Sequence, residues 1–144
     1  MEILTERVGG KLHGVLPDQS VLSVAQFMKF ENIGAVAVIR DNVLLGVISE
    51  RDIMNKVVGP GLDPREILAG EIMSTDLTFA SPEETSSECL MKMRRLHCRH
   101  LPVVKEGHFF GLLSLRDVLG SDEEQLLDRY LWERNARDAY STMA

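Results

Sequence analysis

The sequence predicts an α/β (α+β) domain built from two copies of one unit, each in the order strand, helix, strand, strand, helix. The first observation is an internal repeat, because residues 46–53 (GVISERDI) return at 111–118 as GLLSLRDV, an offset of 65 residues. Pro17 and Pro82 match at the same offset. A repeat indicates one supersecondary unit used twice. A unit this short would bury its apolar face poorly alone, so we expect the two to pack as one domain.

The composition is that of one compact soluble domain. The chain has 144 residues, of which 44% are hydrophobic and 26% charged, an ordinary globular balance. A net charge of −6 argues against a broad nucleic-acid surface. The N-terminus lacks a signal-peptide pattern, and no run approaches the ~18 apolar residues of a membrane span. With only two cysteines, we expect a reduced, cytoplasmic protein with no nucleic-acid or membrane partner.

The second observation is helical periodicity in two matching segments. Residues 18–32 and 85–97 have apolar side chains at helical spacing. Thr85 and Glu88 stand three apart at the start of the second segment and fit a capping box. We therefore expect one helix in each segment.

The third observation is a pair of hairpins. Buried strands are expected at 35–39 and 101–104, with return strands at 43–48 and 109–113. Asp41-Asn42 and Glu106-Gly107 supply turn residues between them. A second helix follows each hairpin, from about Arg51 and from about Arg116.

Four segments organise the chain. The units are expected at 8–60 and 75–120, separated by a connector at 61–74 and followed by a helical tail at 121–144. Within the connector, residues 64–68 suit a short helical turn. The tail has amphipathic spacing, and its aromatic residues favour docking on the domain or on a second subunit.

The residues that close each unit carry a family resemblance. Gly-apolar-apolar-Ser-x-Arg-Asp occurs at 46–52 and at 111–117, and residues 99–103 (RHLPV) precede the second hairpin. Together these resemble the CBS domain pair, named after cystathionine β-synthase, over about residues 8 to 120. The resemblance implies a ligand-sensing, pseudo-two-fold pair of units that often stacks as a disc-like homodimer. It also implies an adenosine ligand such as AMP, ATP, NAD(H) or S-adenosylmethionine, and this sequence looks most like small stand-alone pairs that take AMP or NAD(H).

Two Ser/Asp pairs are the central candidate residues. Ser49 with Asp52, and Ser114 with Asp117, lie where a strand passes into a helix. A helix N-terminus presents free N–H groups to a phosphate, and an aspartate can accept from both hydroxyls of a ribose. The resemblance assigns the same roles, phosphate to the serine and ribose to the aspartate. Ser-x-x-Asp also fits a capping box, which stabilises a helix by about 1 kcal/mol without a ligand, and both roles can hold.

The purine would occupy an apolar slot with backbone polar groups at its edge. The resemblance places it between the opening residues of each unit and the start of the following hairpin. The candidate residues are His13, Val15, Ala35, Val36 and Ala37 in the first unit, and Thr78, Ala80, Arg99, His100, Leu101 and Pro102 in the second. The family often has threonine at the Thr78 position, where the first unit has His13, so the second site is expected to be the stronger.

The remaining candidates have two interpretations each. Arg51 and Arg116 could neutralise phosphate charge or lie on a solvated helix face. His100 could contact phosphate, stack on the base or be a surface histidine. His97, Cys98 and His100 lack a fourth ligand at a recognisable spacing, so no metal is expected.

The leading hypothesis is a regulatory adenine-nucleotide sensor that changes conformation when its ligand binds. The sequence has no Ser-His-Asp arrangement, no Walker loop and no close carboxylate cluster, so we expect no enzymatic activity. The alternative is a ligand-independent module for dimerisation, or for docking on an unidentified partner protein.

Overall fold

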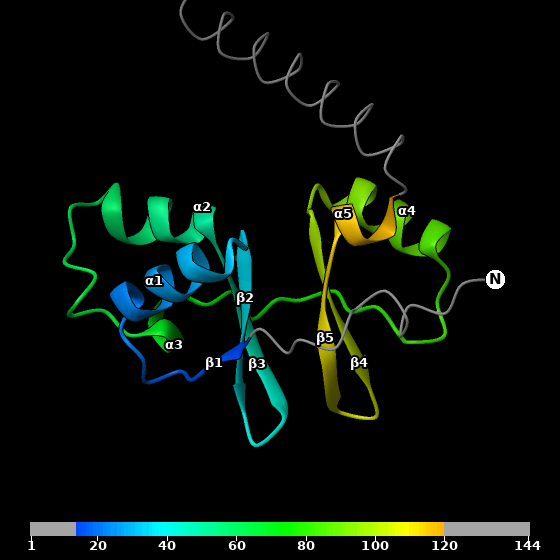
Figure 1. Ribbon diagram of the computed structural model, residues 1–144, viewed down its shortest axis with the longest axis horizontal. Coiled ribbons are helices and arrows are strands. Elements are labelled where there is room, and N and C mark those ends of the chain that lie inside the picture. Colours follow the sequence, from blue (N-terminus) through cyan, green and yellow to red (C-terminus); the bar gives the residue numbers. More distant parts are fainter. Residues whose placement is uncertain (1–13, 120–144) are drawn as a thin grey trace, which may run out of the picture.

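Two hairpin-and-helix units lie side by side in the computed structural model, which describes residues 14–119 (Figure 1). The first unit and the connector contain β1 (Gly14–Val15), α1 (Val21–Glu31), β2 (Ala35–Arg40), β3 (Val43–Ser49), α2 (Glu50–Ile53), the π-helix η2 (Met54–Val58) and α3 (Ala69–Ile72). The second unit contains α4 (Ser86–Leu96), β4 (His100–Lys105), β5 (His108–Ser114) and α5 (Leu115–Val118). This order confirms the α/β fold and the repeat. The expected tail helix and His13 lie outside the described residues.

The sheets of the two units differ at their opening strand. In the first unit β1 pairs parallel to β2, and β2 pairs antiparallel to β3. In the second unit β4 and β5 pair antiparallel, and Ala80 alone bridges Val103 in the parallel sense. Ala80 N–H donates to Pro102 O at 2.8 Å, and Ala80 O accepts from Val104 N–H at 2.9 Å. The expected opening strand is therefore reduced to a single bridge, because Pro102 has no N–H with which β4 could continue the pairing.

Both hairpins turn as their sequences predict. Asp41 and Asn42 have φ values of 51° and 62°, and Glu106 and Gly107 have 51° and 78°. Two consecutive positive φ values are typical of the tight turns that suit the right-handed twist of a hairpin. The strand register also shifts at equivalent places, between 38 and 39 and between 103 and 104. The repeat thus extends to irregularities of the backbone.

The long helices begin at capped residues. Ser20 Oγ accepts from the N–H of Ser23 at 3.1 Å at the start of α1. Thr85 and Glu88 form the predicted capping box at the start of α4. Asn32 and His97 end α1 and α4 in the left-handed conformation. Both helix predictions are confirmed to within a few residues.

The connector is bonded to the first unit along its length. Residues 64–66 form a hydrogen-bonded turn, in which Glu66 N–H donates to Asp63 O at 3.0 Å, and the helix α3 follows at 69–72. Pro64 O and Ile67 O accept from the first N–H groups of α1, which holds 64–68 in an irregular turn. Met73 then packs over Gly46, where a Cβ would lie 2.8 Å from the Met73 sulfur, and Ser74 pairs with Val47. The glycine of the repeated motif is therefore a packing position in the first unit.

The apolar core consists of two clusters, one in each unit. The first contains Val15, Val21, Val24, Met28, Val36, Val38, Ile48, Val57, Ala69 and Ile72. The second contains Ala80, Cys89, Met93, Leu101, Val103, Leu113 and Val118. The hairpins contact one another through β3 and β5, and Phe109 N–H donates to Asn42 O at 3.3 Å. Within residues 14–119, every helix is too short or too polar to cross a bilayer.

Candidate functional site

The two Ser/Asp pairs form matching capping boxes. In the first unit Asp52 Oδ2 accepts from Ser49 N–H at 2.9 Å and from Ser49 Oγ at 3.1 Å, and Asp52 N–H donates to Ser49 Oγ at 3.2 Å. In the second unit Asp117 Oδ2 accepts from Ser114 N–H at 2.8 Å, and Asp117 N–H donates to Ser114 Oγ at 3.2 Å. The capping role is therefore confirmed for all four residues. Their role toward a ligand stays a prediction.

The capping boxes lie beside the start of the neighbouring strand. Ser49 is the register partner of Ala35, and Ser114 is the register partner of His100. Equivalent backbone bonds hold this arrangement, from Glu50 N–H to the oxygen of residue 34 at 2.9 Å and from Leu115 N–H to the oxygen of residue 99 at 2.8 Å. The structure thus brings the predicted phosphate and ribose residues next to the predicted purine residues in each unit.

The purine candidates divide by exposure. The buried ones are Val15, Ala35, Val36, Ala37, Ala80, Leu101 and Pro102. The exposed ones are Thr78 and Arg99, together with the predicted phosphate residues Arg51 and Arg116. Because the buried side chains already pack in the core, these residues can offer a ligand mainly backbone groups, which at Pro102 means the C=O alone. A purine that bound at these residues would contact backbone groups at its edge, and the exposed side chains of the set would lie nearer to solvent.

Gly34 marks a contact between the units that sequence reasoning missed. A Cβ on Gly34 would lie 3.4 Å from Glu50 Oε1 and 3.7 Å from His100 Cε1. Glu50 belongs to the first unit and His100 to the second, so the absence of a side chain at residue 34 lets both approach the same point. The sequence gives one indication of this, a carboxylate inside the Ser-Glu-Arg-Asp motif, but it cannot place the histidine opposite.

Burial lowers the pKa of His100 below the 6.5 of a free histidine. The carboxylates of Asp117 and Glu50 oppose that shift, and Arg99 adds to it. A histidine whose folded pKa lies below its unfolded pKa stabilises the fold fully above the unfolded value, and this stability is lost as the pH falls below it. Because His100 is held in its neutral form in the folded protein, the free energy of unfolding should fall as the pH drops below 6.5.

We expect His100→Asn to flatten the acid dependence of the melting temperature. Between pH 7 and pH 5 the wild type should lose stability as His100 takes up a proton on unfolding, and the variant should lose less. Thermal melts at a series of pH values measure this. His108→Asn, at an exposed position on β5, is the matched control. Parallel curves for the wild type and His100→Asn would contradict the assignment.

From the sequence, His97, Cys98 and His100 are candidate metal ligands, and no metal is expected there. Over residues 14–119, the structure has no group of three His, Cys, Asp or Glu side chains able to hold a metal.

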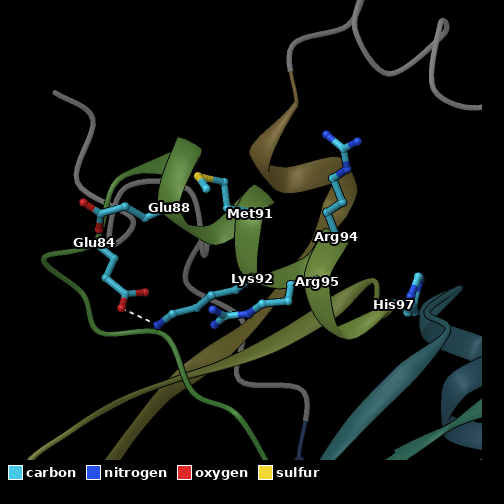
Figure 2. Close-up of a pocket in the computed structure, with 7 residues that line it drawn as sticks. All are labelled: Glu84, Glu88, Met91, Lys92, Arg94, Arg95 and His97. Atoms are coloured by element: carbon cyan, nitrogen blue, oxygen red, sulfur yellow. Dashed lines mark hydrogen bonds and ion pairs between the residues drawn. The ribbon is translucent and has the colours of Figure 1, made fainter.

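A hollow of about 720 Å³ lies along α4 (Figure 2). Its lining includes Glu84, Glu88, Met91, Lys92, Arg94, Arg95 and His97, with Lys92 paired to Glu84. None of these seven residues belongs to the predicted nucleotide sites.

Comparison with known proteins places this fold and motif in one family. The CBS domain model matches residues 10–59 and 69–124. The chain therefore belongs to the CBS domain family and carries two CBS repeats, as the resemblance predicted.

The similar proteins include several that are named for CBS domains. The CBS domain-containing protein YhcV of Bacillus subtilis is 31% identical over 104 residues, which cover 72% of this chain and 74% of YhcV. Among solved structures, the CBS domain protein NE2398 is 29% identical with a TM-score of 0.75, covering 81% of this chain and 94% of that one. Hypoxic Response Protein I, solved with two coordinated zinc ions, is 25% identical with a TM-score of 0.73, covering 81% of this chain and 96% of that one.

Proposed function

We propose that this CBS domain pair is a regulatory sensor of adenine nucleotides, with AMP, ATP or NAD(H) as its ligand. The observation that carries the proposal is the duplicated Ser-x-Arg-Asp motif, placed in each unit beside the start of a strand. In the second unit Ser114 is the register partner of His100, and Asp117 acts electrostatically on the same imidazole. A hydroxyl, a carboxylate and an imidazole thus lie near one another at the start of α5, and the proposal includes no enzymatic step.

Each of these groups suits one part of a nucleotide. The hydroxyl of Ser114 and the guanidinium of Arg116 suit a phosphate, since a charged hydrogen bond to phosphate is among the stronger polar contacts. The carboxylate of Asp117 suits a ribose diol, because an ionised carboxylate only accepts hydrogen bonds and has two oxygens with which to do so. The base would lie between residues 78–80 and residues 100–102.

The contact at Gly34 gives the ligand a route to both units. A nucleotide that touches His100 in the second unit also bears on Glu50 of the first, since the two side chains approach the same point. A ligand shifts a conformational equilibrium by its difference in affinity for the two states. We therefore expect regulation to act through the relative placement of the two units.

A thermal-shift screen tests the proposal. The wild type should show a saturable rise in melting temperature with AMP, ADP, ATP, NAD, NADH or S-adenosylmethionine, since a ligand at 100 times its Kd adds about 2.7 kcal/mol of stability. Asp117→Ala and Asp52→Ala identify which site is occupied. Each variant is compared with its own ligand-free melt, because losing the cap alone costs about 1 kcal/mol. No shift with any compound would favour the ligand-independent dimerisation or docking module instead.

We also propose that the chain forms a disc-like homodimer through its helices. The most exposed large apolar side chains on helices are Phe30 (86%), Met91 (73%), Val58 and Met54. They come from α1, α4 and η2, and Figure 1 shows α1, α2, α4 and α5 on the side of the molecule opposite the hairpin turns. Large exposed apolar side chains on helices of both units favour a protein interface.

A further inference from the structure

Lys92 on α4 is bonded to the segment that opens the second predicted nucleotide site. Its ammonium group donates to the carbonyl oxygen of Phe79 at 2.9 Å and pairs with Glu84 Oε1 (Figure 2). Phe79 stands between Thr78 and Ala80, which are both predicted to contact the ligand. Only 23% of the Lys92 side chain and 22% of the Glu84 side chain are exposed. The lysine thus bonds to the chain at the site without being one of the residues predicted to touch the ligand.

The bond from Lys92 holds one peptide group from its second side. The C=O of Phe79 and the N–H of Ala80 belong to the same planar peptide group, in which they point in opposite directions. On one side, Ala80 N–H donates to Pro102 O of β4 at 2.8 Å. On the other side, the oxygen of Phe79 accepts from the lysine of α4. This peptide group is therefore bonded to a strand through its hydrogen and to a helix through its oxygen.

Glu84 anchors the other end of the same segment. Its N–H donates to Ser81 O at 3.0 Å, and its Oε2 accepts from the thiol of Cys89, a buried residue of α4, at 3.7 Å. Lys92 thus bonds to residues 79–84 at both ends, at the carbonyl of Phe79 and at the carboxylate of Glu84. Because both bonds come from α4, the placement of this segment depends on the placement of the helix.

The first unit holds its opening segment in another way. At the offset of 65 residues, Lys92 matches Phe27 and Glu84 matches Gln19. The ring of Phe27 packs against the first core and has no N–H with which to donate. Both residues of β1 pair with β2, whereas the second unit has one bridge, at Ala80. In the second unit a helix side chain thus supplies an anchor where the strand pairing is shorter.

We propose that Lys92 is a positioning residue for the second nucleotide site, which holds the backbone at residues 78–80 in the conformation that receives the ligand. The inference rests on the proposed nucleotide binding and adds a residue that acts on the ligand through the backbone. A segment that loses this anchor spends a smaller fraction of its time in the binding conformation, and the apparent Kd rises in inverse proportion to that fraction.

Affinity measurements on the full chain test the positioning role. Asp52→Ala removes the predicted ribose acceptor of the first site, so that titration in this background reports on the second. Isothermal titration with AMP then compares Lys92 with Lys92→Met and Lys92→Arg. We expect Lys92→Met to weaken AMP about three- to tenfold, the effect of roughly one lost hydrogen bond. Lys92→Arg should restore the affinity to within about twofold, since a guanidinium can donate to Phe79 O and to Glu84 at once.

Adenosine and a neighbouring cation separate positioning from direct attraction of the phosphate. Lys92→Met should weaken adenosine as much as AMP, because residues 78–80 are predicted to hold the base. A loss confined to AMP would mean that Lys92 pairs with the phosphate, and that result overturns the proposal. Arg95→Met removes the same charge from an exposed position of the same hollow and should leave both affinities unchanged. An equal loss in Arg95→Met would make charge alone the cause and also overturns the proposal.

Hydrogen exchange tests the anchor without a ligand. The amide of Ala80 should exchange about three- to tenfold faster in Lys92→Met than in the wild type, because the segment opens more easily when one anchor is lost. Lys92→Arg should exchange at the wild-type rate. An unchanged rate in Lys92→Met overturns the proposal. If Lys92→Met does not fold, the double variant Lys92→Met, Glu84→Gln repeats both measurements, because it leaves no half-buried carboxylate without its cation.

Failure of this proposal is distinguishable from failure of the nucleotide proposal. AMP bound equally by Asp52→Ala with and without Lys92→Met leaves the sensor function standing and removes the role of Lys92. AMP bound by the wild type and lost in Asp52→Ala has the same consequence, since the ligand then occupies the first site. No binding of AMP or adenosine to the wild type removes the role of Lys92 in receiving them, and no binding of any compound in the thermal-shift screen removes both proposals.

Discussion

Replacing Leu113 by alanine is expected to lower the free energy of unfolding by about 2 to 5 kcal/mol. Leu113 lies on β5, is completely buried and belongs to the same apolar cluster as Leu101 and Val103. Truncation removes buried methyl groups and leaves a cavity that its neighbours fill only in part. Urea denaturation followed by circular dichroism measures the change.

Phe110→Ala is the matched control for this variant. Phe110 lies on the same strand but is 46% exposed, so its truncation should cost less than about 1 kcal/mol. A comparable loss in both variants would mean that β5 does not present Leu113 to the core and Phe110 to the surface. The repeat predicts that Ile48→Ala, at the equivalent position of β3, behaves like Leu113→Ala.

The combined variant Phe30→Glu, Met91→Glu is expected to convert the proposed homodimer to a monomer. In a helix-to-helix dimer these side chains would be buried, and an unpaired carboxylate is costly to bury. Size-exclusion chromatography with light scattering gives the mass in solution, which should fall by half. Thermal melts of the variant check that each chain remains folded.

Val43→Glu is the control for the dimer. Val43 is also exposed and apolar, but it lies at the hairpin turn of β3, away from the helices. This variant should remain a dimer. A monomeric wild type, or a dimer that survives glutamate at both helix positions, would contradict an interface made by the helices.

The parts of the fold that local sequence patterns determine could be predicted. The turn residues at 41–42 and 106–107, the capping box of Thr85 and the periodicity of both long helices act within a few residues of themselves. Three features were not predicted, and the first of them depends on contacts distant in sequence. They are the position of α3, the continuation of α2 as a π-helix and the reduction of the second opening strand to Ala80.

The candidate site divides in the same way. Ser49, Asp52, Ser114 and Asp117 could be chosen because the repeat presents each pair twice in register. The meeting of Glu50 with His100 could not, since the two residues belong to different units. The ion pair of Asp52 with Lys56, 3.2 Å between Oδ1 and Nζ, could have been predicted from its i,i+4 spacing. The bond from Lys56 Nζ to Ile72 O, at 2.8 Å, requires the folded connector.

Pro102 affects the hydrogen bonding of Thr78, one of the residues of the predicted second nucleotide site. In a parallel pair with Ala80 opposite Val103, the next bond of the ladder would run from the N–H of residue 102 to the carbonyl oxygen of Thr78. Proline has no such hydrogen, so β4 cannot satisfy that oxygen, whereas the equivalent residue of the first unit, Ala37, keeps its donor. A backbone carbonyl is a strong acceptor, and Thr78 is exposed, so its oxygen can accept from water or from a ligand that binds there. The proline at residue 102 thus leaves the carbonyl oxygen of Thr78 available to a hydrogen-bond donor from outside the sheet.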